Sequence, residues 1–368
     1  MTAKRRKLVL IGGGHAHVAV LADWIRHGLP CDHAVLLTPS SQLRYSGMVP
    51  GWIAGRYDRG EGTVDLAGLA QRAGAELILG RAAGIDPAAR FIETDDGTRV
   101  AFDLASIDTG GVGVAVERLG ADPRLMDVRP IDRFVDVLAQ APPAGCTAVV
   151  GGGAGGTELA FALRNRDDAA ERSVVLVAGA EGLLPGFADA VRANVLREFA
   201  RQGIEVIAGE ARFEDGSLFA GERSLEPLDL IVAALGSGAP EWPASGGLAS
   251  DAQGFVAVDR YQRSISHPHI FAAGDVAARQ DRALAHSGVH AVFAGPVLAA
   301  NLRAALNGQA PQQTYQPRWN NLYLLSTGDG AAIASYGPFS AQGRCVGRLK
   351  HWIDTRWISK YSALANGR

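Results

Sequence analysis

Cysteine is scarce in this sequence, and no unbroken apolar run is long. The 368 residues include only three cysteines, Cys31, Cys146 and Cys345, and no C-x-x-C pair. A disulfide scaffold is therefore not expected, and a reducing compartment fits. No apolar run approaches the roughly 20 residues that span a bilayer. The basic opening leads into only a few apolar residues before glycine, too few for a signal-peptide core. We expect a cytoplasmic protein.

The sequence also lacks an excess of either charge. Its formal net charge of -2 argues against a nucleic-acid binder that works by bulk positive charge, so no nucleic-acid partner is expected. The chain is long enough to bury a large core, and two domains are the natural expectation. Glycine, in contrast, is abundant, with 46 residues, and many stand at the ends of apparent strands, as in nucleotide-binding α/β folds.

An apolar strand, a glycine turn and an amphipathic helix follow one another twice along the chain. The complete copy is CTAVVGGGAGGTELAF, with Gly151, Gly153 and Gly156 in the pattern G-x-G-x-x-G. The first glycine permits a tight turn, the second lets the backbone approach a pyrophosphate, and the third lets the helix pack on the strand. The free N–H groups of the helix then bind the phosphates. This copy predicts a dinucleotide site.

The other copy, VLIGGGHAHVAVL, departs from the pattern at its third position. Gly12 and Gly14 fit, but His17 stands where a glycine is expected. Taken alone, this run fits a chance occurrence as well as a nucleotide site. Asp275 in HIFAAGDVA favours a site, because a short acidic side chain at the mouth of a buried strand can bind a polyol hydroxyl. The alternative role for Asp275 is a helix N-cap.

Two nucleotide folds and a late Gly-Asp strand resemble the two-dinucleotide-binding flavoproteins of the pyridine nucleotide-disulfide oxidoreductase-like superfamily. In that family the first unit binds FAD, an inserted unit binds NAD(P)H, and the chain returns to finish the FAD domain. FDLASIDTGG and LDLIVAALGS match the family's two A-T-G-like strands, although Asp108 and Leu235 depart from the consensus. The resemblance implies an α/β fold of two Rossmann-like domains. The expected parts are an FAD domain in residues 1–112 and 251–312, an NAD(P)H domain in 113–250, and a C-terminal segment in 313–368.

Within the superfamily, five stretches resemble one branch more closely. GGGHAHV, YSGMVPG, GPVLAANL, LSTGDG and KHWID are similar to the FAD-containing NADH dehydrogenase-like module often fused to selenide, water dikinase. The sequence holds no dikinase part. By this resemblance the histidine variant is a true FAD turn, in which Ala16 takes over part of the close packing. His15 is then a candidate contact of the flavin or pyrophosphate, and His17 a helix-packing residue.

The resemblance implies two sets of binding residues. The FAD set is Gly12, Gly14, His15, Ala16, Thr38, Pro39, Met48, Pro50, Thr109, Gly110, Gly274, Asp275, Gly288 and Val289. The NAD(P)H set is Gly151, Gly153, Gly156, Glu158, Ala178 and Gly236. The helix from Gly288 is expected to favour negative charge at the pyrimidine end of the flavin.

Three of these residues depart from, or qualify, the family pattern. Thr38 replaces the expected ribose-binding acid. Ala178, with no nearby Arg or Lys, weakly favours NADH over NADPH as co-substrate. Glu158 matches a family glutamate near the nicotinamide, and its alternative role is a first-turn acid that complements the helix dipole.

The activity expected from this resemblance is plain flavin chemistry. RYSGMVPGWIAG contains no cysteine where the disulfide enzymes carry their dithiol, and sulfide:quinone oxidoreductases need several cysteines near the flavin. We expect an FAD-dependent NAD(P)H oxidoreductase, like the non-pumping NADH dehydrogenases, that reduces a quinone or another small acceptor. No catalytic base and no metal site are expected. The alternatives are a reductase of a protein or selenium-containing acceptor, and a flavin-containing redox sensor.

The stretch RLKHWIDTRWISKY predicts an amphipathic helix. Its apolar residues recur at helical spacing on one face, and basic residues flank them. The apolar set is Leu349, Trp352, Ile353, Trp357 and Tyr361, and the basic set is Arg348, Lys350, Arg356 and Lys360. Such a helix suits a membrane surface, which would place the protein peripherally on the inner face of the cytoplasmic membrane. The alternative is a helix that docks on the FAD domain.

Overall fold

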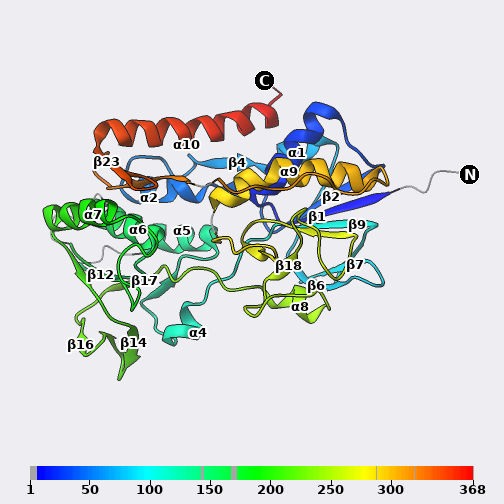
Figure 1. Cartoon of the computed structure of the whole chain (residues 1–368). Coiled ribbons are helices and arrows are strands. Elements are labelled where there is room, and N and C mark those ends of the chain that lie inside the picture. The colour runs from blue at the N-terminus through cyan, green and yellow to red at the C-terminus, as the bar shows by residue number, and fades with distance from the viewer. Residues whose placement is uncertain (1–5, 142–144, 167–171, 287, 319, 368) are drawn as a thin grey trace, which may run out of the picture.

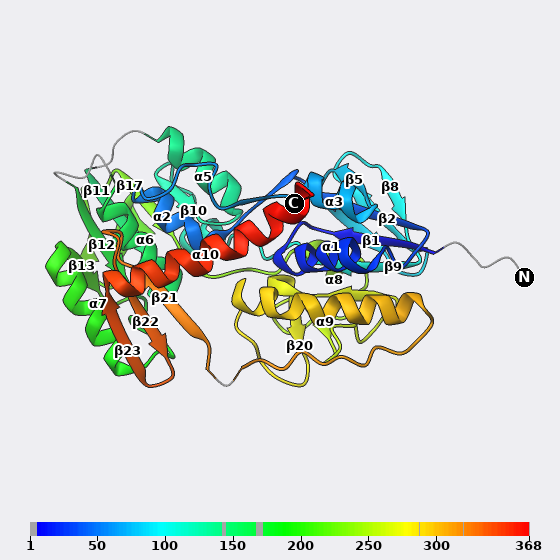
Figure 2. The ribbon, with the colours of Figure 1, turned by 90° about the horizontal axis from the view of Figure 1, so that it is seen from above.

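The computed structural model describes residues 6–141, 145–166, 172–286, 288–318 and 320–367. These residues form two lobes, each built around a five-stranded parallel sheet. One long C-terminal helix lies across both lobes (Figures 1 and 2). The expected α/β class with two Rossmann-like units is confirmed.

The sheet of the first lobe has the strand order β19-β9-β1-β2-β5. Its strands are β1 (Lys7–Ile11), β2 (His33–Thr38), β5 (Glu76–Leu79), β9 (Leu104–Ile107) and β19 (Ile270–Ala272). The helices on one face are α1 (His15–His27), α3 (Leu66–Ala73) and α9 (Gly288–Leu306). The opposite face carries the meander β6 (Ala82–Asp86), β7 (Phe91–Thr94) and β8 (Arg99–Ala101).

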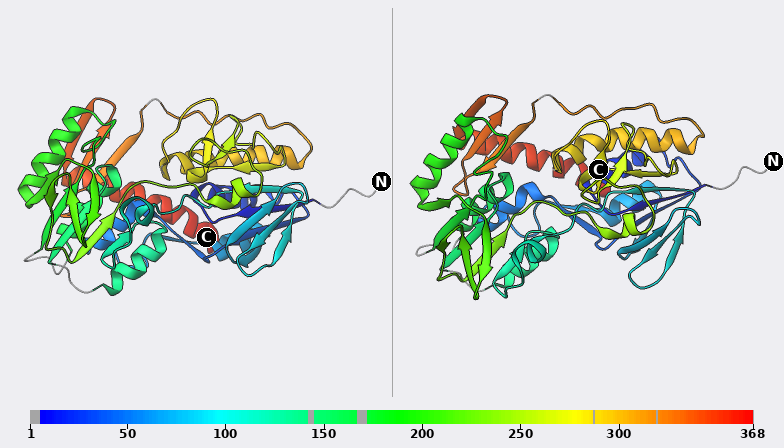
Figure 3. Two further views of the ribbon diagram at one scale, coloured as in Figure 1. Left: turned by 90° about the horizontal axis from the view of Figure 1, so that it is seen from below. Right: turned by 60° about the horizontal axis from the view of Figure 1, so that its bottom comes forward.

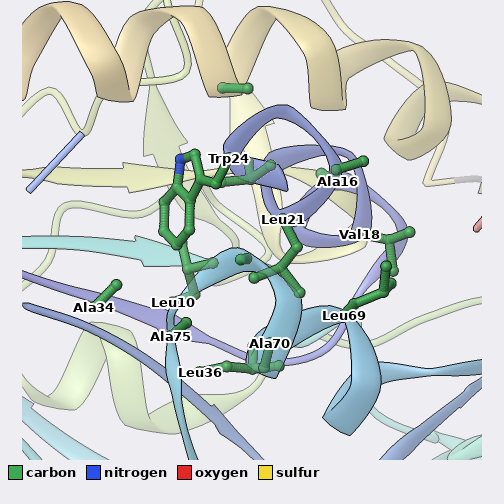
Figure 4. Close-up of a cluster of buried hydrophobic side chains, with 14 of the residues drawn as sticks. Leu10, Ala16, Val18, Leu21, Trp24, Ala34, Leu36, Leu69, Ala70 and Ala75 are labelled. Atoms are coloured by element: carbon green, nitrogen blue, oxygen red, sulfur yellow. The ribbon is translucent and has the colours of Figure 1, made fainter. Parts of the chain in front are cut away.

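Alternation along β1 explains how this sheet is buried on both faces. Leu8 and Leu10 belong to the core formed with α1, α3 and α9, whereas Val9 and Ile11 belong to the core formed with the meander. Successive side chains of a strand point to opposite faces, so an unbroken apolar strand serves two cores. Figure 4 shows the helix side, where Trp24 and other α1 side chains meet residues of β1, β2 and α3.

Helix α9 is the one helix, among the residues described, that is long and apolar enough to cross a membrane. Its mean hydropathy is 1.4, and 44% of it is buried inside the protein. The expectation that no apolar segment approaches the length of a membrane span is therefore corrected for Gly288–Leu306. Packing accounts for the composition: a Cβ on Gly295 would lie 2.6 Å from the Ala19 Cβ and 3.0 Å from the Ala16 carbonyl oxygen. We interpret α9 as a core helix of the first lobe, and Pro296 leaves it continuous.

The second lobe repeats the plan with the strand order β10-β17-β11-β12-β13. Its strands are β10 (Leu125–Asp127), β11 (Cys146–Val150), β12 (Ser173–Val177), β13 (Ile204–Ile207) and β17 (Leu230–Ala233). One face packs on the helices α5 (Ile131–Gln140), α6 (Ala154–Arg164) and α7 (Asp189–Gln202). The other packs on α4 (Ala115–Leu119) and on β14 (Ala211–Glu214), β15 (Ser217–Ala220) and β16 (Arg223–Ser224).

The chain enters the sheet of the second lobe after Val112 and leaves it before Gly238, and a bridge joins these two residues. Helices α2 and α10 also connect the two lobes (Figure 3). Beyond Gly238, Trp242 and Leu248 pack in the core of the first lobe. The predicted boundary at residue 250 is therefore too late. The reason is that α8 (Glu241–Ser245) seats on β6 of the first lobe, a long-range contact with no local sequence signal.

The remaining elements lie around the first lobe or where the two lobes meet. Between β2 and α3 stand β3 (Gln42–Arg44), η1 (Ser46–Met48), α2 (Val49–Ile53) and β4 (Thr63–Asp65). Around β19 stand β18 (Val256–Val258), η2 (Gly274–Val276) and β20 (Ala277–Arg279). The C-terminal segment forms β21 (Leu322–Ser326), β22 (Ala332–Tyr336), β23 (Phe339–Gly343) and α10 (Arg344–Ala365).

Candidate functional site

The glycine turn of the second lobe, between β11 and α6, has the geometry of an open dinucleotide turn. Gly151 adopts φ 130°, which favours glycine. A Cβ on Gly156 would overlap the Gly151 carbonyl oxygen, so only glycine lets α6 pack this closely on the strand. Beside Gly153, in contrast, a Cβ would meet nothing within 4 Å. The space through which a pyrophosphate would approach the helix N-terminus is therefore free, and the residues present fit a dinucleotide.

Two other predicted NAD(P)H residues lie at the same edge of this sheet. Ala178 follows β12 and is 6% exposed, and its carbonyl oxygen would lie 2.7 Å from a Cβ on Gly152. Gly236 follows β17 and adopts φ 88°. Because β17, β11 and β12 are neighbours, both residues flank the glycine turn.

The glycine turn of the first lobe, between β1 and α1, keeps the strained first glycine. Gly12 adopts φ 94°, and a Cβ there would lie 2.5 Å from the Asp108 carbonyl oxygen. His17, in the third position, is fully buried: its Nδ1 lies 2.6 Å from the Gly12 carbonyl oxygen, and its Nε2 2.8 Å from the Ser106 Oγ. A carbonyl only accepts, so Nδ1 donates and Nε2 accepts the Ser106 hydroxyl hydrogen. Burial lowers the pKa of His17 to about 4, so the ring is neutral.

The predicted FAD residues that follow the strands gather around this turn. Thr38 and Pro39 follow β2, Thr109 and Gly110 follow β9, and Gly274 and Asp275 follow β19. These three strands neighbour β1 or its partner, so their carboxyl ends form one edge, as expected for a Rossmann site.

Asp275 is held across the lobes. Its carboxylate accepts a hydrogen bond from the Arg129 guanidinium of the second lobe at 2.8 Å, and the residue is 9% exposed. It lies in η2 and makes no side-chain cap, and α9 begins only at Gly288, so the alternative of a helix N-cap is wrong. A buried carboxylate beside a glycine turn fits the polyol of FAD.

The predicted ring-contact residues lie where the two lobes meet. Met48 and Pro50 are buried, and α2 packs against α6 of the second lobe. The start of α9 lies beside the same turn, since a Cβ on Gly288 would be 3.9 Å from the Ser46 Oγ, and Val289 follows it. The residues that would hold a flavin ring here come from η1, α2 and the start of α9.

His15 belongs to an aromatic cluster rather than to an open surface. Its ring lies 5.7 Å from Tyr45 and 5.2 Å from Trp357 of α10, measured between centroids. Burial lowers its pKa to about 4. The His15 Nε2 is buried without a hydrogen-bond partner among the described residues. The predicted packing residue Ala16 is fully buried and donates its N–H to Asp108 Oδ2 at 2.8 Å.

Glu158 meets two residues that the sequence did not predict for the site, Lys350 and Asp354 of α10. The Lys350 Nζ lies 3.7 Å from Glu158 Oε1 and 3.1 Å from Asp354 Oδ2, and it donates to the Gly47 carbonyl oxygen at 3.1 Å. Glu158 also accepts the Ser326 N–H at 2.8 Å. The Lys350 ammonium group therefore links α6 and α10 to the turn Ser46–Met48, which we call the flavin-side turn.

The electrostatics of this group follow from burial and from its shared cation. Burial raises the pKa of Glu158, and Lys350 partly offsets that shift. Burial also raises the pKa of Asp354, again offset by Lys350. For Lys350, burial lowers the pKa, but the two carboxylates outweigh it and the net shift is upward. Lys350 is thus a fixed positive charge where the lobes meet.

The prediction that five apolar residues of α10 share one buried or exposed face is wrong. Tyr361 is 4% exposed and packs in the core of the first lobe, whereas Trp352 is 56% and Leu349 42% exposed. Lys350, predicted on a solvated flank, has a side chain only 14% exposed. The cause is the length of α10, which changes packing partner from β22 to α3 along its course (Figure 2).

The three cysteines are free, and none lies in the flavin-side segment from residue 44 to residue 55. Cys345 is exposed, and Cys31 and Cys146 are half-buried. Over the described part of the chain, no three metal-ligating side chains come together.

Comparison with known proteins gives one family. A family model described as pyridine nucleotide-disulphide oxidoreductase matches residues 6–295. The chain is similar to NADH dehydrogenase-like protein YutJ of Bacillus subtilis (strain 168), with 23% identity over 284 residues, covering 74% of this chain and 77% of that protein. It is also similar to the ferredoxin--NAD(+) reductase component of the p-cumate 2,3-dioxygenase system of Pseudomonas putida, with 28% identity over 289 residues, covering 74% and 68%. It shares the fold of the sulfide:quinone oxidoreductase of Aquifex aeolicus, with a TM-score of 0.78 and 18% identity, covering 98% and 92%.

Proposed function

This chain belongs to the pyridine nucleotide-disulphide oxidoreductase family and is an FAD-dependent NAD(P)H oxidoreductase, and we propose that it oxidises NADH and reduces a quinone or another small acceptor. The observation that carries the proposal is the contact of Lys350 with both Glu158 and Gly47. It joins the open turn of the second lobe to the flavin-side turn of the first, with no cysteine between them.

FAD, when bound, supplies the hydride-accepting chemistry. The residues of the chain bind and orient the reactants. Glu158 and Lys350 close the junction of the lobes, and Asp354 and Tyr45, both largely buried, keep water from this pair. The N-terminus of α9 faces the same turn and favours negative charge there. Hydride transfer needs no general base.

The proposal is tested by mixing the yellow holoenzyme anaerobically with NADH and following flavin absorbance. We expect rapid bleaching, followed by reoxidation with a soluble quinone. Ferredoxin and selenite belong in the acceptor panel, since one relative is named a ferredoxin reductase and the GGGHAHV and YSGMVPG stretches resemble the dikinase-associated branch. Reoxidation by ferredoxin or selenite but not by quinone would reassign the acceptor. A flavin that NADH cannot reduce contradicts the proposal altogether.

Lys350 offers a sharper test with a matched control on the same helix. Lys350→Met should slow flavin reduction by at least about tenfold, because a charge fixed at the reactive junction is lost. Lys350→Arg should restore part of the rate. Lys360→Met, which removes an exposed lysine one face away, should leave the rate unchanged. Equal rates in all three variants would remove Lys350 from the site.

We propose NADH as the preferred co-substrate, and the support is Ala178 with no cation beside it in the sequence from 173 to 191. Ala178→Arg should shift the preference toward NADPH, because Arg pairs with a 2′-phosphate. The measurement is kcat/KM for both nucleotides. A parent enzyme that prefers NADPH contradicts this assignment.

We also propose a cytoplasmic protein that rests peripherally on the inner face of the cytoplasmic membrane through the outer side of α10. The support is the exposure of Trp352 and Leu349 beside the exposed cations Arg348 and Arg356 on this helix; Phe339, on the adjoining strand β23, is 73% exposed. Aromatic and basic residues on one helix side suit an anionic lipid surface. Sedimentation with anionic vesicles should carry the protein down at low salt, and Trp352→Ser should reduce it. Equal recovery with neutral and anionic vesicles would argue against it.

A further inference from the structure

The space beside the middle glycine is open in the turn of the second lobe and is occupied in the turn of the first lobe. Gly14 (φ -70°, ψ 174°) and Gly153 (φ -72°, ψ -179°) have nearly the same conformation and precede equivalent helices. A Cβ on Gly153 would meet nothing within 4 Å, whereas a Cβ on Gly14 would overlap the Asp108 carboxylate. An internal carboxylate thus occupies the place beside the helix N-terminus that an anion takes in an open turn.

The two oxygens of this carboxylate face different neighbours. Asp108 Oδ2 accepts two of the free N–H groups of the α1 N-terminus, from Ala16 at 2.8 Å and from His17 at 3.0 Å. Asp108 Oδ1 points toward η2, because a Cβ on Gly274 would overlap it. No described residue forms a hydrogen bond with Oδ1. One oxygen therefore anchors the helix, and the other faces the strand ends that surround the FAD site.

The surroundings favour the neutral form of this side chain. Asp108 is 2% exposed, and burial raises its pKa to about 7, against the opposing effect of the His17 and Ala16 N–H groups. The Asp275 carboxylate raises it further. A doubly charged pyrophosphate in the same region acts in the same direction, since like charges disfavour ionisation.

We propose that Asp108 binds the pyrophosphate of FAD as a neutral carboxylic acid, whose Oδ2 accepts the α1 N–H groups while its Oδ1–H donates to a phosphate oxygen. The inference rests on FAD use by the first lobe and on nothing about NADH or the acceptor. It replaces the direct contact of helix and phosphate by a contact through one side chain. FAD should consequently be held more weakly as the pH rises and Asp108 loses its proton.

Three histidines and one ion-paired carboxylate are the other groups near Asp108 or Asp275. His15 and His17, on α1, have pKa values of about 4 and are neutral above pH 6. His290, on α9, has a pKa lowered chiefly by burial. Asp275, in η2, is ion-paired with Arg129. Between pH 6 and pH 9, Asp108 is the group whose proton is at stake.

The test measures release of FAD from diluted holoenzyme between pH 6 and pH 9, by the fluorescence of free FAD. For the wild type we expect the dissociation constant to rise by up to about tenfold per pH unit above pH 7. Asp108→Asn keeps an acceptor for α1 and a donor for the phosphate, so its dissociation constant should match the wild type at pH 6 and stay flat. Asp108→Ala lacks the donor and should release at least about tenfold more FAD at pH 6.

Three results would overturn the proposal: a flat profile in the wild type, a pH-dependent profile in Asp108→Asn, or tighter FAD binding in Asp108→Ala at pH 6. The last would show an ionised Asp108 that repels the cofactor. If Asp108→Ala does not fold, the Asp108→Asn profile decides alone. NADH takes no part in the assay, so a failure of the proposed NADH activity leaves this test unaffected.

Discussion

The turn of the second lobe is closed by small residues. Gly156 lies against the Gly151 carbonyl, and Ala234 lies beside both glycines. On the neighbouring strand β17, Val232 pairs with Val149, the penultimate residue of β11. Helix α6 is therefore held on its strand by close apolar contact, and its N-terminus remains free.

The turn of the first lobe is closed by polar side chains at the same positions. His17 replaces the third glycine, Asp108 stands in place of the alanine, and Ser106, which pairs with Leu10, stands in place of the valine. The three residues form one connected set of hydrogen bonds with the turn and the helix. A histidine can therefore replace the third glycine of this motif only where other residues satisfy its hydrogen bonds, because a histidine alone would leave buried polar atoms without partners.

The largest effect is expected when the histidine of the first turn is introduced at the matching position of the second turn. Gly156→His places a side chain where even a Cβ overlaps the Gly151 carbonyl, and Val232 and Ala234 offer no hydrogen bonds. We expect the free energy of unfolding to fall by about 3 kcal/mol or more, from overpacking. Denaturant unfolding measures this, with Gly155→Ala as the control, because a Cβ there meets open space. A Gly156→His protein as stable as the control would contradict the account of this turn.

The reverse change in the first turn should have a smaller but clear effect. His17→Gly removes the ring that bonds Gly12 and Ser106 and leaves both oxygens buried. We expect a loss of about 2–3 kcal/mol in the free energy of unfolding, from the unsatisfied groups and the cavity. His27→Gly, at the exposed end of the same helix, controls for the change in helix propensity. Similar losses in the two variants would show that the buried ring contributes nothing.

A double substitution tests whether His17 and Ser106 stabilise the first turn together. Ser106→Val introduces the residue that the second turn uses, and in the wild type it should cost about 1–2 kcal/mol, because His17 Nε2 loses its partner. In the His17→Gly background that partner is already gone, so the valine should cost less or stabilise. The expected coupling is about 1 kcal/mol. Strictly additive free energies of unfolding would separate the two residues.

A further expected effect is a pH dependence that belongs to the first turn alone. The folded pKa of Asp108 is about 7, above its ordinary 3.8, so its stabilising contribution is complete below pH 3.8 and is lost as the pH rises through about 7. The wild type should lose stability relative to Asp108→Asn over that window, by at most about 1.4 kcal/mol per pH unit. Chemical denaturation at pH 5, 6 and 7 measures the difference. A constant difference would mean that Asp108 is ionised throughout.

His17 has the opposite sign. Its folded pKa of about 4 lies below the ordinary 6.5, so the unfolded chain takes up a proton first as the pH falls below 6.5. Its contribution to stability is lost toward pH 4. His17→Gly should therefore be less sensitive to acid than the wild type in the same denaturation series.

Local patterns were enough to predict the strand–turn–helix units. Contiguous residues predict where β1 ends at Ile11 and β11 at Val150, and which helices follow. They also predict the end of α7 at the αL glycine Gly203. The family resemblance supplied the order of the lobes. His17 was expected to pack rather than to react, and the structure buries it, but its partner Ser106 is far away in the chain and carried no signal.

The residues that sequence reasoning missed are all long-range partners. Asp108 was noticed only as a departure from a consensus, since nothing local says that it faces Gly14. Lys350 was expected on a flank of α10, because helical spacing places it beside the apolar stripe. Arg129, which holds Asp275, belongs to the other lobe. Such contacts depend on how the two lobes and α10 meet, and helical periodicity does not encode that.

The late position of Lys350 has a consequence for how the protein is made. Both dinucleotide-binding lobes leave the ribosome before α10 does, and domains generally fold as units during synthesis. The residues of both glycine turns are thus synthesised before the ammonium group that joins Glu158 to Gly47. A chain that ends before α10 would lack this junction and also the Tyr361 and Ala365 side chains of the first lobe's core. Synthesis of α10 therefore completes the first core and the junction of the lobes together.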